Sequence, residues 1–124
     1  MVEKRRFVRI DHPIRVRYRI EGKEEGEGEA LSKNIGGMGI CLLLNEAFPV
    51  GSLLKLILDV PGTGEPVETA AQVVWVDKVE RRDGSSTADF EVGVKFTSIT
   101  NVGKASIINF IYESVAKRKN KVSS

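Results

Sequence analysis

Three arginines stand close together near the start of the chain, in the stretch EKRRFVRIDH at 3–12. Arg5, Arg6 and Arg9 repel one another, so folding alone gives little reason for the cluster. A guanidinium group offers a planar fork of donors that grips phosphate with two hydrogen bonds, and its face stacks on aromatic bases. Such a cluster is suited to a compact, doubly charged anion. The alternative is a solvated basic tail, which is what most charge runs are.

A second stretch, LSKNIGGMGICLLL, places Asn34 and three glycines between two apolar runs. Gly36, Gly37 and Gly39 allow a tight turn and let backbone N–H groups come close to a ligand. The alternative is a β-turn without any ligand. A P-loop needs Gly-Lys-Ser/Thr before a helix, and the Rossmann fingerprint also opens a helix, whereas a strand pattern follows these glycines.

Other residue types that carry chemistry are scarce. His12 is the only histidine and Cys41 the only cysteine among 124 residues. An internal disulfide is therefore excluded, and zinc sites and Ser-His-Asp arrangements lack their usual residues. With no convincing carboxylate pair either, we expect a binding protein without a cofactor, not an enzyme.

Composition also limits the partners. The formal net charge of +2 is too small for a protein that coats nucleic acid, and the aromatic content of 6% is low for a barrel that stacks single-stranded bases. No apolar run is long enough to span a bilayer, and charged residues at 3–6 occupy the place of a signal peptide's apolar segment. We expect a cytoplasmic protein that binds no nucleic acid polymer and does not insert into membranes.

Alternating apolar residues predict the strands that must hold the candidate residues. At 14–20 the apolar side chains alternate with Arg15, Arg17 and Arg19, which should face solvent. An acidic, glycine-containing stretch follows and indicates a hairpin turn that leads into a second strand. Later strand patterns lie at 37–45, 53–60, 68–80 and 90–99. Trp75, within the third of these, is expected in the core.

We therefore expect a mainly β fold, a small six-stranded antiparallel β-barrel with a C-terminal α-helix, because closure of a barrel removes exposed strand edges. The helix is predicted over 100–119 and should cover one barrel opening. Its apolar stripe recurs at spacings near three and four: Val102, Ile107, Ile108, Ile111 and Val115. The expected organisation is a single domain over 1–124, with a flexible basic arm at 1–10, the barrel at 11–99, the helix, and a tail at 120–124.

The two candidate groups together resemble the motifs of the PilZ family. That family carries an Arg-x-x-x-Arg arm, here Arg5 and Arg9, followed by an (Asp/Asn)-x-Ser-x-x-Gly turn, here Asn34 to Gly39. QVVWV at 72–76 and VGVKFTSI at 92–99 are similar to the family's later strands. The resemblance covers nearly the whole chain, and it implies a bacterial receptor domain for the second messenger cyclic di-GMP (c-di-GMP).

The resemblance also implies roles for the site residues. Arg5 and Arg9 would contact phosphate and guanine edges, with Arg6 in support, and Asn34 would offer its amide to a guanine edge. Gly36, Gly37 and Gly39 would let the backbone approach the nucleotide. Closure of the arm would change a surface that a downstream effector protein, of unknown identity, binds.

One position departs from the family pattern. Gly36 stands where the motif has serine, and a shifted register would instead use Ser32, Asn34 and Gly37; we prefer the unshifted register. Loss of one neutral hydrogen bond costs about 0.5–1.5 kcal/mol, whereas each charge-assisted bond from an arginine contributes about 1.5–3 kcal/mol. On these magnitudes binding is weakened and not abolished. The alternative is a degenerate PilZ-like protein-interaction module that binds no nucleotide.

Overall fold

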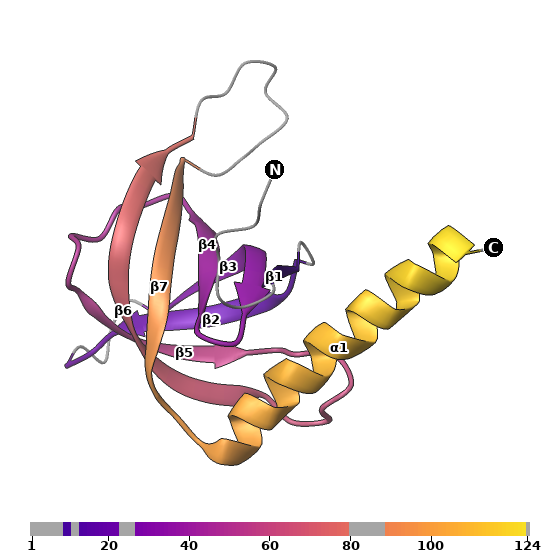
Figure 1. The fold of residues 1–124 in the computed structure, drawn as a ribbon. Coiled ribbons are helices and arrows are strands. Elements are labelled where there is room, and N and C mark those ends of the chain that lie inside the picture. Colours follow the sequence, from indigo (N-terminus) through magenta and orange to yellow (C-terminus); the bar gives the residue numbers. More distant parts are fainter. Residues whose placement is uncertain (1–8, 11–12, 23–26, 80–88, 124) are drawn as a thin grey trace.

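The structure, a computed structural model, describes residues 9–10, 13–22, 27–79 and 89–123, with side chains for 13–22, 27–79 and 89–116. Its strands curve around a common core, with one long helix beside them (Figure 1). The described elements are β1 (Arg9–Ile10), β2 (Arg15–Ile20), β3 (Gly28–Gly36), β4 (Gly39–Leu44), β5 (Leu53–Leu58), β6 (Val67–Lys78), β7 (Phe90–Ile99) and α1 (Asn101–Ser123).

Strands β2 to β7 form a closed antiparallel barrel. Its order is β3-β2-β5-β6-β7-β4, and pairing of β4 with β3 closes the ring. The predicted fold class, a six-stranded antiparallel barrel with a C-terminal helix, is thereby confirmed. The short strand β1 is additional, and it pairs with the end of β3 beyond the part that pairs with β2.

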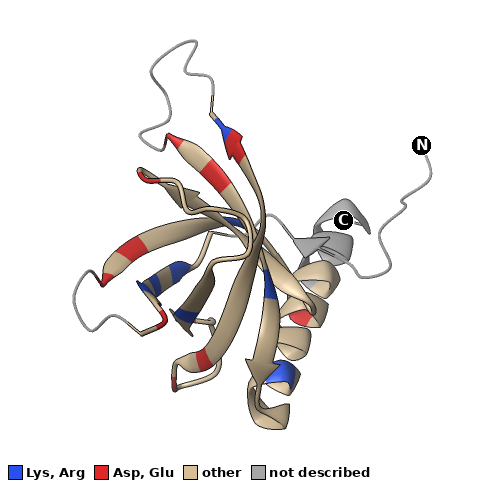
Figure 2. Ribbon diagram, turned by 90° about the vertical axis from the view of Figure 1, so that its left-hand side faces the viewer, with Lys and Arg blue, Asp and Glu red and all other residues tan. Residues whose placement is uncertain are grey.

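The barrel interior is filled by the alternating apolar residues of its strands. Val16 and Tyr18 of β2 are buried, as are Leu54, Leu56 and Leu58 of β5. Each such side chain contributes about 1.5–3 kcal/mol when it leaves water. The outer surface is charged: Arg15 and Arg19 are exposed and Arg17 is half-buried, as the alternation predicts. Acidic and basic positions are interspersed over the strands in the view of Figure 2.

Helix α1 closes one end of the barrel. Its residues Ile107, Phe110 and Ile111 join the core, and the helix contacts β1, β3 and β6. Thr100 caps the helix, since its Oγ1 accepts a hydrogen bond of 3.0 Å from the Gly103 N–H. The prediction that Val102 belongs to the buried stripe is wrong: its side chain is 78% exposed.

Val102 is exposed and not buried because of the way the helix lies on the barrel. Ile107, Phe110 and Ile111 are spaced three and four residues apart and form a stripe of their own, in which Phe110 was not predicted. Val102 lies outside this stripe. The helix also extends to Ser123, past the predicted end at 119, and residues 120–123 contain no glycine or proline that would end it earlier.

An aromatic pair joins β2 to the segment between β4 and β5. The rings of Tyr18 and Phe48 meet edge to face with centroids 5.8 Å apart. The Tyr18 hydroxyl donates a hydrogen bond of 3.1 Å to Oε1 of Glu46. Gly28 of β3 lies opposite Tyr18 and has no room for a side chain, because a Cβ there would overlap the tyrosine ring.

Candidate functional site

A β-bulge in β3 sets the direction of Asn34. Ala30 and Ser32 are buried on the inner face, so strict alternation would also turn Asn34 inward. The β3–β4 register shifts between Ser32 and Asn34, however, and leaves Lys33 as an extra residue. Ile35 therefore takes the next inner position, and half-buried Asn34 lies on the outer face. Bulges of this kind re-aim side chains.

The β1–β3 pairing brings the two candidate groups together. Arg9 lies directly opposite Gly36, and Ile10 lies opposite Ile35. Of Arg9 the structure describes only the backbone, and Arg5 and Arg6 lie outside the described residues. The end of the predicted arm is thus next to the glycine turn, which follows 27 residues later in the chain.

The glycines of the turn differ in their surroundings. A Cβ on Gly39 would overlap the carbonyl oxygen of Val94, so the close approach of β4 to β7 requires glycine there. A Cβ on Gly37 would have no neighbour within 4 Å, and Gly37 does not have a positive φ. Gly36 is buried. The packing around Gly37 gives no reason for its missing side chain, and the space beside it is open to a ligand.

Ser32 is committed to the fold. Its side chain is buried, and its hydroxyl oxygen accepts a hydrogen bond of 3.0 Å from the Ile14 N–H. A serine that serves as a hydrogen-bond partner inside the barrel wall is not available to a ligand outside it. This argues against the shifted motif register, in which Ser32 would contact the nucleotide.

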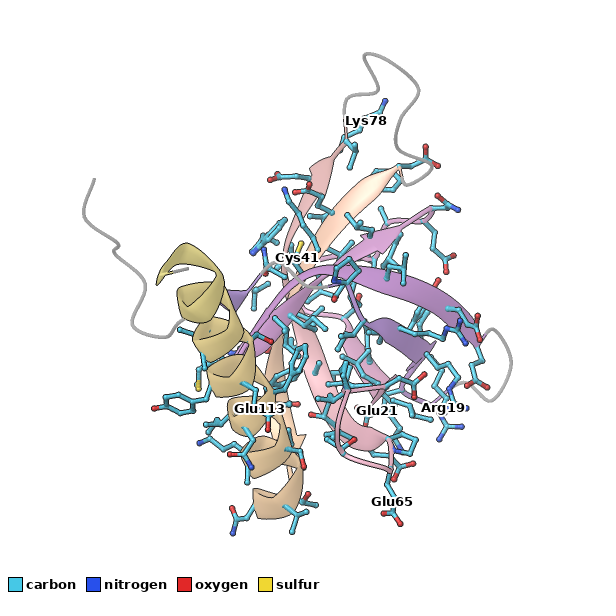
Figure 3. The ribbon with its side chains drawn as sticks, turned by 90° about the vertical axis from the view of Figure 1, so that its right-hand side faces the viewer. Arg19, Glu21, Cys41, Glu65, Lys78 and Glu113 are labelled. Atoms are coloured by element: carbon cyan, nitrogen blue, oxygen red, sulfur yellow. The ribbon has the colours of Figure 1, made fainter. Side chains whose placement is uncertain are left out.

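A second bulge brings Trp75 to the same outer face, and its predicted place in the core is wrong. The β6–β7 register shifts between Val73 and Trp75, so Trp75 lies opposite Gly93 and is half-buried. A Cβ on Gly93 would overlap the indole, which therefore lies directly over this glycine. The row across the four strands is Asn34, Cys41, Gly93 and Trp75; Cys41 lies in the barrel wall (Figure 3).

Two lysines border this face. Exposed Lys95 lies opposite Gly39, and the nearby Phe96 N–H donates a hydrogen bond of 2.9 Å to the Met38 carbonyl, which fastens the turn to β7. Lys33 forms an ion pair of 2.7 Å with Glu91. Sequence patterns did not single out Lys95, because only the β4–β7 pairing brings it beside the turn. The site therefore offers an outward amide, an open backbone stretch and nearby cations, a combination suited to an anion with polar edges.

Comparison with known proteins agrees with this fold. The model of the PilZ domain family matches residues 3–113. The chain therefore belongs to the PilZ domain family. A search of the curated proteins finds no match.

Solved structures share the barrel at low sequence identity. The chain is similar to the inhibitor of motility MotI/DgrA from Bacillus subtilis, with 22% identity and a TM-score of 0.75 over 94% of this chain and 53% of that one. It is also similar to the PilZ domain of YcgR from Escherichia coli with c-di-GMP, with 14% identity and a TM-score of 0.74 over 98% and 99% of the two chains. It is similar as well to the K. pneumonia MrkH–c-di-GMP complex, with 16% identity and a TM-score of 0.73 over 97% of this chain and 56% of that one. The chain thus spans about half the length of MotI/DgrA and of MrkH.

Within the described residues, no helix has both the length and the apolar character needed to cross a bilayer.

Proposed function

We propose that this chain is a c-di-GMP receptor or adaptor domain, a binding protein of the bacterial cytoplasm and not an enzyme. Arg5, Arg6 and Arg9 would close over the nucleotide at the Asn34–Gly39 turn. The observation that carries the proposal is the register of β1 on β3, which sets Arg9 opposite Gly36 beside outward-facing Asn34. Support also comes from the PilZ structures of YcgR and MrkH, which contain c-di-GMP.

The chemistry of each group matches one part of the ligand. Guanidinium groups bind the two phosphates and the O6/N7 edge of guanine with paired hydrogen bonds. The Asn34 amide has both a donor and an acceptor for a base edge. Open space at Gly37 lets the backbone approach the nucleotide closely. Once bound, the dianion neutralises arginines that repel one another in the free protein.

The ordering of the arm would be the output signal. β1 contacts α1 as well as β3, so an arm held by nucleotide would alter the surface formed by these elements. A downstream effector protein would read that surface. Ordering of a segment by a ligand is a common switching mechanism.

Calorimetric titration with c-di-GMP at moderate salt tests the proposal. We expect heat for the wild type, and for Arg9→Ala an affinity lower by about ten- to a hundredfold, the loss of one charge-assisted contact of about 1.5–3 kcal/mol. Arg5→Ala should behave alike. Arg19→Ala is the matched control, since it removes an exposed arginine from the far part of β2, and it should bind like the wild type.

The second candidate function is a degenerate PilZ module that binds a protein partner without nucleotide. The observation in its favour is Gly36, which replaces the motif serine and is buried. No heat from the wild type, together with a partner retained equally with and without c-di-GMP, would establish this second function in place of the first.

A further inference from the structure

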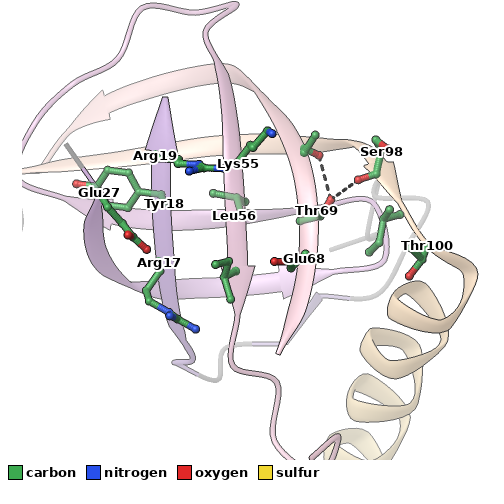
Figure 4. Close-up of a pocket in the computed structure, with 13 residues that line it drawn as sticks. Arg17, Tyr18, Arg19, Glu27, Lys55, Leu56, Glu68, Thr69, Ser98 and Thr100 are labelled. Atoms are coloured by element: carbon green, nitrogen blue, oxygen red, sulfur yellow. Dashed lines mark hydrogen bonds between the residues drawn. The ribbon is translucent and has the colours of Figure 1, made fainter. Parts of the chain in front are cut away.

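An open hollow of about 520 Å³ lies over β2, β5, β6 and the end of β7 (Figure 4). This volume is within the range of small-ligand sites. In the order of the barrel β5 is opposite β4, so the hollow lies across the barrel from the Asn34–Gly39 turn. The proposed nucleotide site does not use it.

Two like charges face each other at this hollow. Arg19 of β2 lies directly opposite Lys55 of β5, and both side chains are exposed. Like charges directly opposite on neighbouring strands destabilise a sheet. Neither side chain forms an ion pair within the part of the chain that the structure describes. No ion pair among the described residues offsets this repulsion, and a bound carboxylate would do so.

The next row of cross-strand neighbours carries both a basic and an acidic residue. Arg17 is opposite Ile57, and Ile57 is opposite Glu68 on β6. Glu27 also lines the hollow, on the side of Arg17 and Tyr18 (Figure 4). These two carboxylates would repel a dense polyanion such as a polyphosphate or a nucleic acid. They would attract a single cation that accompanies the anion.

The spacing of the two rows matches an extended peptide. The rows are two residues apart along each strand, about 6.8 Å, which is also the spacing of alternate side chains in an extended chain. Glu68 also lies one strand across from Lys55, about 4.8 Å, so the peptide would cross the strands obliquely. The surface between the charges is apolar and half-buried at Ile57 and Ala70, and Ser98 offers a hydroxyl beside Ala70. An extended peptide with a neutral residue between an acidic and a basic residue fits this surface.

We propose that the hollow binds an extended segment of a partner protein with an acidic and a basic side chain two residues apart. The carboxylate is held by Arg19 and Lys55, and the cation lies at Glu68. The inference does not depend on nucleotide binding, because the hollow and the candidate nucleotide site lie on different sides of the barrel.

Amide chemical shifts of the full chain test this inference. The probe is a capped heptapeptide with Glu and Lys two positions apart among Thr and Ser, added to millimolar concentration. We expect shifts at β2, β5 and β6. The double substitution Arg19→Gln and Lys55→Gln should weaken binding on the order of tenfold, since two exposed ion pairs are lost. Arg15→Gln, an exposed arginine of the same strand outside the hollow, is the control and should change nothing.

Several results would overturn the inference: no shifts at the hollow, equal affinity for a peptide with Gln in place of both charges, equal affinity of the double variant, or tighter binding of inorganic pyrophosphate than of the peptide. Lys55→Gln should not lower the melting temperature, because it removes the repulsion with Arg19, so lost binding is not a sign of unfolding. The peptide titration repeated with Arg9→Ala should be unchanged, which separates this inference from the proposed nucleotide function.

Discussion

At the scale of single residues, two positions of the Asn34–Gly39 turn, 37 and 39, are glycine for different reasons. Gly39 lies against the backbone of β7, where a Cβ would overlap the Val94 carbonyl, whereas Gly37 faces open space. The first glycine is explained by packing within the barrel. The second is explained by the proposed approach of a ligand.

Alanine substitutions at these glycines should therefore have opposite effects. Gly39→Ala should lower the free energy of unfolding by about 1–3 kcal/mol, the usual cost of overpacking. Gly37→Ala should leave stability unchanged or raise it by about 0.4–1 kcal/mol, because it restricts the unfolded chain, yet it should weaken c-di-GMP binding several-fold, about 1 kcal/mol. Urea denaturation and calorimetry measure the two quantities. A Gly37→Ala variant with wild-type affinity would contradict the role given to this glycine.

Tyr18 predicts a dependence of stability on pH. Burial, and next the negative charge of Glu46 and the hydrogen bond to it, raise the pKa of Tyr18 above its usual value of 10.0. Unfolded tyrosine ionises at lower pH than the folded one, so this contribution is fully present below pH 10 and is lost as the pH rises through the folded pKa.

Urea denaturation between pH 9 and 12 should therefore show a fall in unfolding free energy that is smaller in Tyr18→Phe. Glu46→Gln keeps a hydrogen-bond acceptor but removes the negative charge. Tyr18 should therefore ionise at a lower pH in this variant than in the wild type, which tyrosinate absorbance measures. Equal pH profiles for the wild type and Tyr18→Phe would refute the assignment.

At the scale of elements, the two bulges mark the limit of sequence-based prediction. Alternation correctly predicted the inner faces of β2 and β5, because their registers are regular. It placed Trp75 in the core, since nothing in the local pattern announces the shift between Val73 and Trp75. Asn34 was identified from its motif, but its outward direction depends on the extra residue Lys33.

The helix shows the same limit. A three-and-four spacing predicted α1 and its buried Ile107 and Ile111, but several stripes fit one helix, and the barrel surface decides between them. For this reason Val102 was wrongly included and Phe110 was missed. Likewise, Arg9 lies beside Gly36 only because β1 pairs with β3, and no local sequence pattern encodes that pairing.

Substitutions in α1 test how it is attached. Ile107→Ala should lower the free energy of unfolding by about 2–5 kcal/mol, because it opens a cavity where the helix meets the core. Val102→Ala, the matched control on the exposed side, should change it by about 0.5 kcal/mol or less. Similar losses for both variants would show that the helix lies differently on the barrel.

At the scale of the whole molecule, the proposed function joins a closed barrel to a charged arm that binds the nucleotide. β1 lies beside the turn near the barrel end that α1 covers, so a ligand bound there should stabilise the whole fold. A ligand that binds only the folded state stabilises it by mass action.

Thermal unfolding measures this coupling. At a c-di-GMP concentration of 100 times the Kd, the folded state should gain about 2.7 kcal/mol, which raises the melting temperature on the order of 10 °C for a domain of this size. The increase should shrink as salt is added, since it depends on exposed charges. Arg9→Ala should show a much smaller increase at the same ligand concentration, and an increase as large as that of the wild type would remove the arm from the mechanism.

An experimental structure of the full chain with c-di-GMP bound would test the proposed nucleotide site itself. We expect Arg5 and Arg9 to lie within hydrogen-bond distance of the phosphates or guanine edges, with Asn34 at a base edge and the nucleotide against Gly37. A nucleotide bound elsewhere on the barrel, with the arginines turned away from it, would contradict the claim.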